Sequence, residues 1–372
     1  MTTPLDVAYM EADGPTALVE LRVGGDTHRV SFEASVPLFL ERADALVPLA
    51  LIAGMRRRQP IRVHGPVSAR LLANVTRAQQ ILASFTDGEL HSVPVVADAV
   101  SVTTPRSPGT ASFFSGGIDS FASVLRHRSS ITHLVYVQGF DVIVDGTERA
   151  SASRRGAQAA AAELGLPLIE VATNLRDVTD PHVMWGMAHG AALGVVALLL
   201  QSQVGRVLVP SSYPYADLFP WGSHPLLDPL WGNECLDVDH DGCEMTRMQK
   251  VALVAESDVA LRHLRVCTRQ YATYNCGSCR KCLGTMMALR LHGALERCET
   301  LPHTFRTRDL ARVQVTGPTG LVGWREGRAL ARRVKDRPMA LACAWALRPH
   351  PILAVRRPLG RLRRRVTARD PM

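Results

Sequence analysis

The stretch Ala111–Val124 constrains the fold of this chain more than any other part of it. It reads ASFFSGGIDSFASV. The apolar lead-in predicts the end of a buried strand, the two glycines predict a tight turn, and the residues from Phe121 onward predict a helix. Gly116 and Gly117 lack a Cβ, so the backbone there can bring its N–H groups close to a ligand. The helix N-terminus adds unpaired N–H groups and a positive dipole end, so the pattern predicts a phosphate-binding loop.

Polar residues complete this loop. Ser115 and Ser120 carry hydroxyl groups that can donate to phosphate oxygens. Asp119 would repel a bare phosphate, so we expect it to hold a Mg²⁺ ion that bridges phosphate oxygens. Paired glycines after a strand are also ordinary turn chemistry. The six-residue string SGGIDS at a strand-to-helix junction is a more specific pattern, and it is neither a Walker motif nor GxGxxG.

SGGIDS resembles the PP-loop of the N-type ATP pyrophosphatases, a superfamily that includes GMP synthetase, NAD synthetase and several tRNA-thiolating enzymes. The resemblance implies that ATP is cleaved between its α and β phosphates. A substrate oxygen becomes adenylated, pyrophosphate leaves, and a nucleophile then displaces AMP. On this resemblance Asp119 is a catalytic residue that acts through Mg²⁺, and the ATP-binding residues are Ser115, Gly116, Gly117, Ile118, Ser120 and, after the next strand, Gly139.

Strand and helix patterns alternate after residue 110. Strands are expected at 133–140, 166–174 and 206–212, and helices at 152–165 and 185–203. Such alternation predicts an α/β fold with a doubly wound parallel sheet and helices on both faces. Ligands bind beyond the carboxyl ends of the strands in these sheets. One rim should therefore carry the loop at Ser115 and the segments 139–141, 174–177 and 211–215.

Residues 1–105 are predicted to form a small α+β N-terminal domain. A β-hairpin pattern surrounds Gly24 and Gly25, and helical patterns follow at 36–55 and 68–85, with extended segments at 61–65 and 91–100. This unit is expected to pack beside the catalytic domain or to form a homodimer. A proline-rich linker at 103–109 leads to the PP-loop ATP-binding domain at 110–300, which is followed by a basic extension at 301–372.

A helix beyond the nucleotide-binding strands carries two cations. Thr246 can cap it, and Arg247 and Lys250 lie on one face. In the PP-loop superfamily a lysine at the start of such a helix contacts the ATP phosphates. By this resemblance Lys250 is the catalytic cation and Arg247 is the alternative. A cation suits the reaction because negative charge builds up on the leaving pyrophosphate, although an exposed basic pair on an amphipathic helix has the same pattern.

Four cysteines form the second strong motif. They are spaced C-x8-C-x2-C-x2-C, with Gly and Ser inside the first short turn, and they are Cys267, Cys276, Cys279 and Cys282. Closely spaced thiolates and a fourth from an adjacent segment can close a tetrahedron around Zn²⁺, and a four-thiolate site leaves no position open for a substrate. The spacing therefore predicts a structural zinc site. An iron–sulfur cluster is the alternative, since four thiolates serve it too.

A long loop after residue 209 has an unusual composition. Between 210 and 234 it contains several prolines, aromatic residues and the polar residues Asp217 and His224. Long loops in compact domains are usually lids or binding loops. We interpret this one as a substrate wall, with an arm that only covers the end of the sheet as the alternative.

The PP-loop, the helix-opening lysine and the four cysteines together resemble 7-cyano-7-deazaguanine synthase over residues 110–300. That family converts the carboxylate of a deazapurine to an amide and then a nitrile, with ATP and ammonia. The resemblance implies an AMP-forming C–N ligase that joins ammonia or an amine to a small-molecule carboxylate. One alternative is a sulfur transferase acting on an RNA base, for which Cys235 and Cys243 are the candidate thiols. The other is a non-catalytic nucleotide-dependent binding module.

Composition sets the remaining expectations. The apolar run Met187–Leu200 is too short for a membrane span, and no signal-peptide pattern opens the chain, so a cytoplasmic location without a membrane partner is expected. The net charge of +9 resides in the C-terminal part, where fourteen Lys and Arg face three acidic residues from Arg325 onward. We interpret this part as a solvated basic end. Nucleic acid is the less favoured partner because the arginines of 361–369 lack interleaved aromatic residues.

Overall fold

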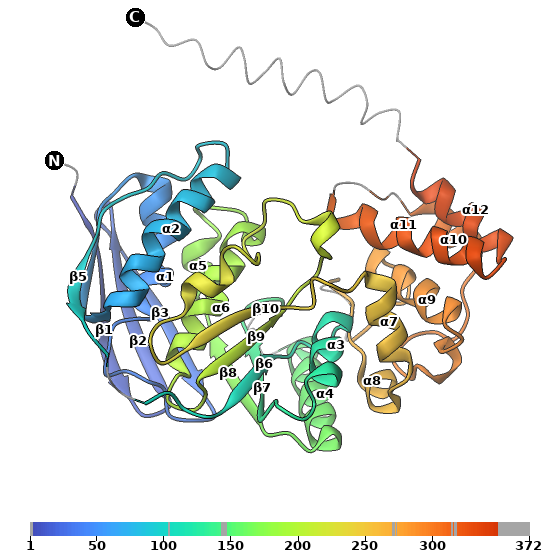
Figure 1. Ribbon diagram of the computed structural model, residues 1–372, viewed down its shortest axis with the longest axis horizontal. Coiled ribbons are helices and arrows are strands. Elements are labelled where there is room, and N and C mark those ends of the chain that lie inside the picture. Colours follow the sequence, from blue (N-terminus) through green and yellow to red (C-terminus); the bar gives the residue numbers. More distant parts are fainter. Residues whose placement is uncertain are drawn as a thin grey trace, which may run out of the picture.

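The computed structural model describes residues 3–102, 105–142, 147–269, 272, 274–313, 315 and 318–348. Within these residues ten strands form one sheet, in the order β10-β9-β6-β7-β8-β3-β2-β1-β4-β5 (Figure 1). The strands are β1 (Leu5–Asp13), β2 (Thr16–Val23), β3 (Asp26–Ala34), β4 (Ile61–Ser68), β5 (Val95–Val100), β6 (Thr110–Phe113), β7 (His133–Gln138), β8 (Leu168–Thr173), β9 (Arg206–Pro210) and β10 (Asp237–Asp241).

Five neighbouring strands, β10-β9-β6-β7-β8, pair in parallel. The predicted α/β class with a mostly parallel sheet is therefore confirmed. The chain runs from β6 outward to β8 and returns to β9 beside β6, so the strand order reverses between β6 and β9. Ligands of α/β sheets bind in the crevice at such a reversal. Strand β10 was not predicted, because its sequence DVDHD has no apolar run.

The N-terminal strands extend the same sheet. β2 and β3 form the predicted hairpin, with Val23 opposite Asp26. β3 then pairs antiparallel with β8, where Phe32 lies opposite Thr173. Asn174, expected on the ligand rim, instead accepts a hydrogen bond from the Ser31 N–H at 2.8 Å. One apolar cluster runs through both halves of the sheet, so residues 5–100 share a core with the parallel strands.

Helices cover both faces of the sheet. α1 (Leu46–Arg57), α2 (Ala69–Phe85) and α6 (Trp185–Leu199) share an apolar cluster with Phe113 and Val135. α3 (Ile118–Arg126) and α4 (Glu148–Leu164) pack on the opposite face, against Phe114 and Leu134. This alternation of faces along β6 and β7 is typical of strands buried on both sides. No helix in the described ranges is long and apolar enough to cross a bilayer.

Helix α1 is shorter than predicted, because residues 36–45 are not helical. The backbone of this segment bonds to other elements: the Phe39 N–H donates to Leu199, and the Ala43 N–H donates to Pro66. Asp44 is 1% exposed, and its carboxylate accepts from the Ser68 N–H at 2.7 Å. These contacts outside the segment outweigh its local helical pattern.

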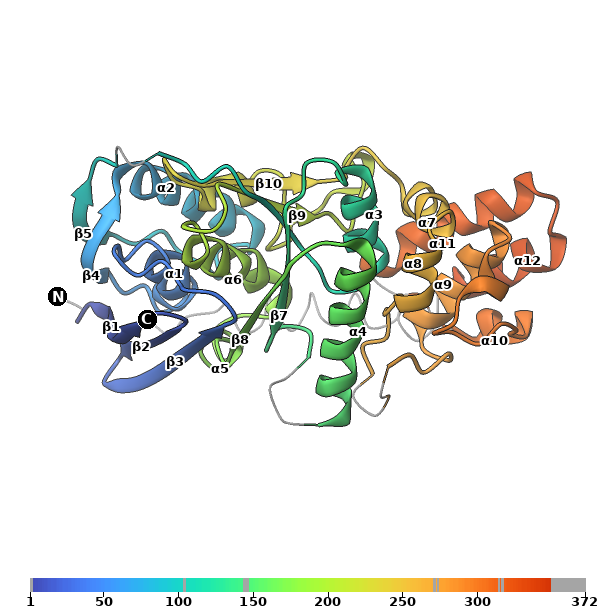
Figure 2. The same cartoon turned by 90° about the horizontal axis from the view of Figure 1, so that it is seen from below.

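The C-terminal helices form the end of the molecule opposite to β1–β5 (Figure 1 and Figure 2). Leu283, Met287, Trp324 and Met339 share a buried cluster there. The predicted solvated basic end, which begins at Arg325, is therefore wrong for residues 325–346, while residues 349–372 lie outside the described ranges. The remaining helices are α5 (Arg176–Thr179), α7 (Arg247–Ala255), α8 (Asp258–His263), α9 (Arg280–Leu291), α10 (Thr307–Arg312), α11 (Pro318–Arg333) and α12 (Arg337–Ala346).

Candidate functional site

A pocket of about 620 Å³ opens at the carboxyl ends of the parallel strands. Its walls come from the loop after β6, the ends of β7, β9 and β10, the first turns of α6, α7 and α9, and one side of α11. It therefore lies at the reversal of strand order. The predicted loop residues that line it are Ser115, Gly117, Ile118, Asp119 and Ser120.

The loop has the backbone of a strand-to-helix turn. Gly116 has φ +73°, in the left-handed region that favours glycine. Gly117 is the N-cap of α3 and provides no side-chain cap. Ser120 does not fill this role, because its hydroxyl donates to the Gly117 carbonyl at 3.0 Å. The first N–H groups of α3 therefore have no side-chain acceptor at the cap and are available to an anion.

Gly139 was predicted to bind the nucleotide, but it does not line the pocket. Its φ is +104°, and a Cβ at this position would lie 1.8 Å from the carbonyl oxygen of Thr173. The glycine is required by the close approach of the end of β8. Its neighbours Phe140 and Asp141 reach the pocket instead.

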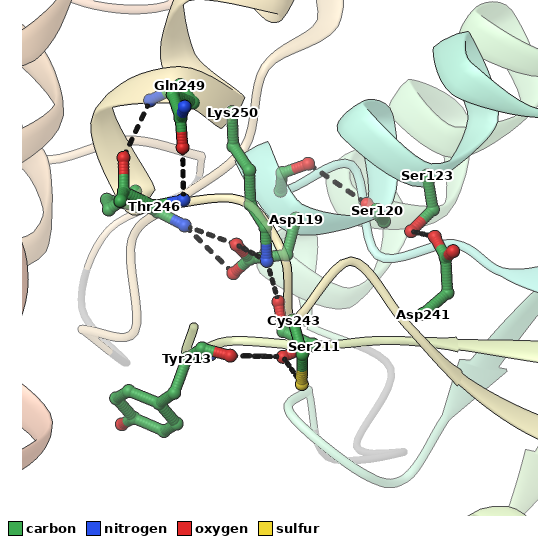
Figure 3. A network of polar contacts seen from close by, with 12 residues as sticks. Asp119, Ser120, Ser123, Ser211, Tyr213, Asp241, Cys243, Thr246, Gln249 and Lys250 are labelled. Atoms are coloured by element: carbon green, nitrogen blue, oxygen red, sulfur yellow. Dashed lines mark hydrogen bonds and ion pairs between the residues drawn. The ribbon is translucent and has the colours of Figure 1, made fainter. Parts of the chain in front are cut away.

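Asp119 connects the loop to α7. Both of its carboxylate oxygens accept hydrogen bonds from Nη1 of Arg247, each at 2.8 Å, and Nζ of Lys250 lies 3.7 Å from Oδ1. Figure 3 shows Asp119 and Lys250 pointing toward one another between the two elements. Burial acts to raise the pKa of Asp119, but Arg247 and Lys250 outweigh it and lower that pKa. Asp119 is thus a stable anion at neutral pH.

The two predicted cations have different positions. Arg247 lines the pocket. Lys250 is 2% exposed and lies outside the pocket lining, where its ammonium group donates to the carbonyl of Ser211. Of the two predicted cations, Arg247 is therefore the one with direct access to the pocket, and the contact of Lys250 with phosphates stays a prediction. The positive charge of Lys250 acts on the carboxylate of Asp119.

The surroundings of Asp119 are cationic, which disfavours a Mg²⁺ ion at this carboxylate in the ligand-free chain. Mg²⁺ in proteins is bound through carboxylate oxygens with near-ideal octahedral geometry. Here both oxygens of Asp119 already accept from Arg247, and Lys250 adds a second positive charge nearby. The predicted role of Asp119 as a Mg²⁺ ligand therefore stays a prediction, while the ligand-free carboxylate pairs with two cations.

Helix α7 is fixed by contacts at its first turn. Thr246 and Gln249 form a capping box, in which each side chain accepts from the backbone N–H of the other (Figure 3). The predicted cap at Thr246 is thus confirmed. A carboxylate oxygen of Glu326, on α11, accepts from the Met248 N–H at 2.9 Å. The C-terminal helices therefore help to orient the helix that carries Arg247.

The four predicted cysteines lie together. Their sulfur atoms are all within 4.8 Å of one another. Backbone N–H groups donate to three of these sulfurs, at 3.2 to 3.4 Å, as they do to thiolates. The hydrogen bond from Cys282 outweighs burial and lowers the pKa of Cys279 to about 4. This donor set fits a metal ion such as zinc.

The cysteine cluster also shapes the pocket. Cys279 is the N-cap of α9, where its sulfur accepts from the Cys282 N–H. The next two residues, Arg280 and Lys281, line the pocket. Gly277 has φ +68°, and a Cβ there would lie 2.7 Å from Pro302, so the turn between the cysteines requires glycine. A metal bound here would hold the start of α9, and with it two cations of the pocket wall.

Aromatic side chains also line the pocket. Tyr213 and Trp221, from the long loop, line the pocket together with Trp185 and His189 of α6. The rings of His189 and Trp221 have centroids 5.6 Å apart. Gly186 allows this packing, since a Cβ there would lie 2.4 Å from the Trp221 ring. The loop that was interpreted as a substrate wall thus contributes two aromatic residues to the pocket.

The two polar residues singled out in that loop do not reach the pocket. Asp217 and His224 are absent from its lining. His224 is 7% exposed, and its Nδ1 accepts from the Leu226 N–H at 3.1 Å. Its ring packs edge-on against Phe85, 5.2 Å between centroids. Its contacts are those of a residue that stabilises the loop.

Arg265 and His240 are two polar pocket residues that sequence reasoning missed. Arg265 precedes the first cysteine of the cluster by two positions, and His240 lies on β10. His240 pairs with Asp228, whose carboxylate lies 2.6 Å from Nδ1. Nothing in their local sequence marks them, because the contacts that define them come from distant segments. The position of Arg265 beside a recognised metal motif was the only available hint.

Comparison of the chain with protein-family models, with curated proteins and with solved structures finds no match. The function therefore has to be argued from the pocket and its residues.

Proposed function

We propose that this chain is an AMP- and pyrophosphate-forming ligase of the PP-loop type, which joins ammonia or an amine to a substrate carboxylate in the manner of 7-cyano-7-deazaguanine synthase. One observation carries the proposal: the SGGIDS loop opens a helix N-terminus into a pocket lined by Arg247, Arg280 and Lys281. A backbone anion site combined with cations suits a triphosphate whose bond cleavage develops negative charge.

The proposed reaction has two steps. A carboxylate oxygen attacks the α-phosphorus of ATP, the bond between the α-phosphorus and the bridging oxygen breaks, and pyrophosphate leaves with the bonding electrons. Ammonia or an amine then attacks the acyl carbon, AMP leaves with the electrons of the carbon–oxygen bond, and the nitrogen releases a proton to solvent. The protein supplies position and charge and forms no covalent bond to the substrate.

The phosphate side of the pocket has the residues that this reaction needs. The N–H groups at the start of α3 and the hydroxyl of Ser115 bind phosphate oxygens, and Arg247 faces the departing pyrophosphate. Asp119 holds Arg247 in place, and Lys250 adds charge behind it. Mg²⁺ enters with ATP as part of the substrate. The acyl substrate would bind against the aromatic residues Trp185 and Trp221.

Zinc at the four cysteines would have a structural role. Four thiolates complete a tetrahedral site and leave no position for a substrate. The residues that would hold the ion are Cys267, Cys276, Cys279 and Cys282, which the structure brings together. Its contribution to the reaction would be to fix the start of α9.

Sulfur transfer to RNA is less well supported. It needs a reactive thiol that a substrate can reach. Cys243 is 1% exposed, contacts the Ser211 hydroxyl at 3.2 Å, and does not line the pocket. Cys235 is 6% exposed and lies outside the lining as well. The pocket therefore favours the ligase over the transferase.

Analysis of the nucleotide products tests the proposal. The protein is incubated with ATP, Mg²⁺ and a panel of carboxylates, and labelled pyrophosphate is added. Because the first step is reversible, a substrate carboxylate should cause the label to enter ATP before any ammonia is present. Addition of ammonium should then release AMP, and labelled carboxylate oxygen should appear in that AMP.

A matched pair of variants makes the test specific. Arg247→Gln removes a pocket cation and should abolish the exchange of label. Arg262→Gln removes an exposed arginine of α8 that pairs with Glu163, and it should leave the exchange unchanged. If the protein converts ATP to ADP and phosphate, ATP is cleaved between its β and γ phosphates and the proposed function is incorrect.

A further inference from the structure

Arg265 stands directly against the phosphate-binding loop. Its backbone N–H donates to the carbonyl of Gly116 at 2.8 Å. A Cβ built on Gly116 would lie 3.5 Å from the Cβ of Arg265, and the side chain lines the same pocket as Ser115 and Gly117. The backbone contact therefore ties the position of this side chain to the loop.

Among the residues that the structure describes, the guanidinium group of Arg265 has no hydrogen-bond or ion-pair partner. The residue is 7% exposed, its Nε is buried without an acceptor, and in the described part of the chain its side chain makes no hydrogen bond or ion pair. Asp141 and the phenols of Tyr136 and Tyr274 act on it only through longer-range electrostatics. Burial, followed by the nearby Arg149, lowers the pKa of Arg265.

Two neighbouring cations do have acceptors in the protein, although Nε of Arg149, like Nε of Arg265, is buried without one. The guanidinium of Arg149 donates to the carbonyls of Arg269, Ala272 and Cys267. Arg247 is bonded to Asp119 through both carboxylate oxygens. A buried cation without a partner costs free energy, and an oxyanion in the pocket would offset this cost. The planar guanidinium also matches phosphate geometry with two parallel N–H donors.

We propose that Arg265 binds the α-phosphate of the nucleotide, the phosphate that remains on AMP. This inference rests on the proposed function. Arg247 reaches the loop from α7 and bonds to Asp119, whereas Arg265 bonds through its backbone to Gly116, three residues earlier in the loop. The groups that act on Arg265 belong to β7, α4 and the segments that follow β7 and precede α9. If Arg247 at Asp119 receives pyrophosphate, Arg265 at Gly116 receives the phosphate that stays behind.

Calorimetric titration with AMP and with inorganic pyrophosphate, each alone, separates the two phosphate positions. Arg265→Gln should weaken AMP binding by about tenfold to a hundredfold and leave pyrophosphate binding within about twofold. Arg265→Lys keeps the charge but loses the two parallel N–H donors of the guanidinium group. Its AMP affinity should lie between those of the unmodified chain and Arg265→Gln. Arg262→Gln, three residues earlier and exposed, serves as the control and should bind both ligands like the unmodified chain.

The melting temperature without ligand distinguishes a ligand-binding role of Arg265 from a structural one. Loss of a structural residue would lower the melting temperature, whereas loss of a ligand-binding cation should raise it. Because Arg265→Gln removes an unpaired buried charge, the ligand-free variant should melt at a higher temperature than the unmodified chain. A lower melting temperature, unchanged AMP affinity, or a loss that falls on pyrophosphate would overturn the inference while leaving the ligase proposal intact. Failure of the unmodified chain to bind either ligand would refute the ligase proposal itself.

Discussion

Asp119 and Arg247 lie 128 residues apart in the sequence, yet Nη1 of Arg247 is 2.8 Å from both carboxylate oxygens of Asp119. The pair joins the phosphate-binding loop to α7. With Lys250 3.7 Å from the same carboxylate, three charged groups form one network at the edge of the pocket. The carboxylate therefore determines where the cation of the pocket wall lies.

Replacing Asp119 with Asn should uncouple this network. In Asp119→Asn the partner of Arg247 loses its charge, and we expect pyrophosphate formation to fall by about a hundredfold to a thousandfold while the fold is kept. Because the two residues act as one unit, the double variant with Arg247→Gln should lose no more than about the larger single effect. Steady-state pyrophosphate release measures both. Asp258→Asn, an exposed carboxylate on α8, is the control, and fully additive losses would contradict the network.

The cysteine cluster should contain about one zinc ion per chain. Cys279→Ser should lose the metal together with most of the folded protein, since metal binding and folding are coupled. Elemental analysis and circular dichroism measure the two effects. Cys298→Ser is the matched control, because Cys298 is buried but lies outside the cluster. Iron with acid-labile sulfide in the purified protein would replace the zinc assignment with an iron–sulfur cluster.

Features that depend on short sequence patterns were predictable. The two glycines of the loop favour a turn. Thr246 caps α7 together with Gln249, three residues later, and three of the four cysteines fall within seven positions. In each case the interacting residues are neighbours along the chain, so their spacing contains the geometry. The parallel α/β class of the sheet follows from the same kind of local alternation.

Features that depend on distant pairing were not predictable. The pairing of Phe32 with Thr173, which joins the N-terminal strands to the rest of the sheet, has no local pattern. Strand β10 exists because β9 offers it a partner, although its own residues are polar. Arg265 becomes a candidate ligand-binding residue only once the structure shows that its side chain has no partner among the described residues. Its type and its local sequence contain no such information.

The contact between α11 and α7 should affect both stability and rate. Glu326→Ala removes the acceptor of the buried Met248 N–H, which should lower the free energy of unfolding by about 1 kcal/mol and disturb the position of Arg247. Burial raises the pKa of Glu326, so the neutral Glu326→Gln, which keeps an acceptor oxygen, is a close control and should resemble the unmodified chain. Urea denaturation and pyrophosphate release provide the measurements. Equal behaviour of the two variants would show that the hydrogen bond does not orient α7.

The pair of His240 and Asp228 predicts a loss of stability at alkaline pH. Nδ1 of His240 lies 2.6 Å from the carboxylate of Asp228, and the side chains are 5% and 1% exposed. Ser223 donates a further hydrogen bond to the same carboxylate at 2.7 Å. Burial opposes protonation of His240, but the hydrogen bonds with Asp228 and Cys243 outweigh it and raise its pKa to about 9.

The direction of this change in stability follows from the pKa of His240 in the folded and in the unfolded chain. The pKa of His240 is higher in the folded chain than its ordinary value of 6.5, so the folded state binds the proton more tightly. The added stability is complete below pH 6.5, decreases as the pH rises, and is gone above about pH 9. A shift of this size corresponds to a contribution of up to about 3 kcal/mol. The nearby His189 and His224 have lowered pKa values because of burial, so they stay neutral over this range.

Urea denaturation at a series of pH values from 6 to 9.5 tests this prediction. The free energy of unfolding of the unmodified chain should fall relative to that of His240→Gln as the pH rises from 6.5 to 9. Asp228→Asn removes the ion pair from the other side, so its curve should be flattened in the same way. The comparison uses differences between curves, which cancels the titration of groups that the variants share. If the curves of all three proteins run parallel across the range, the ion pair contributes no pH-dependent stability and the raised pKa of His240 is wrong.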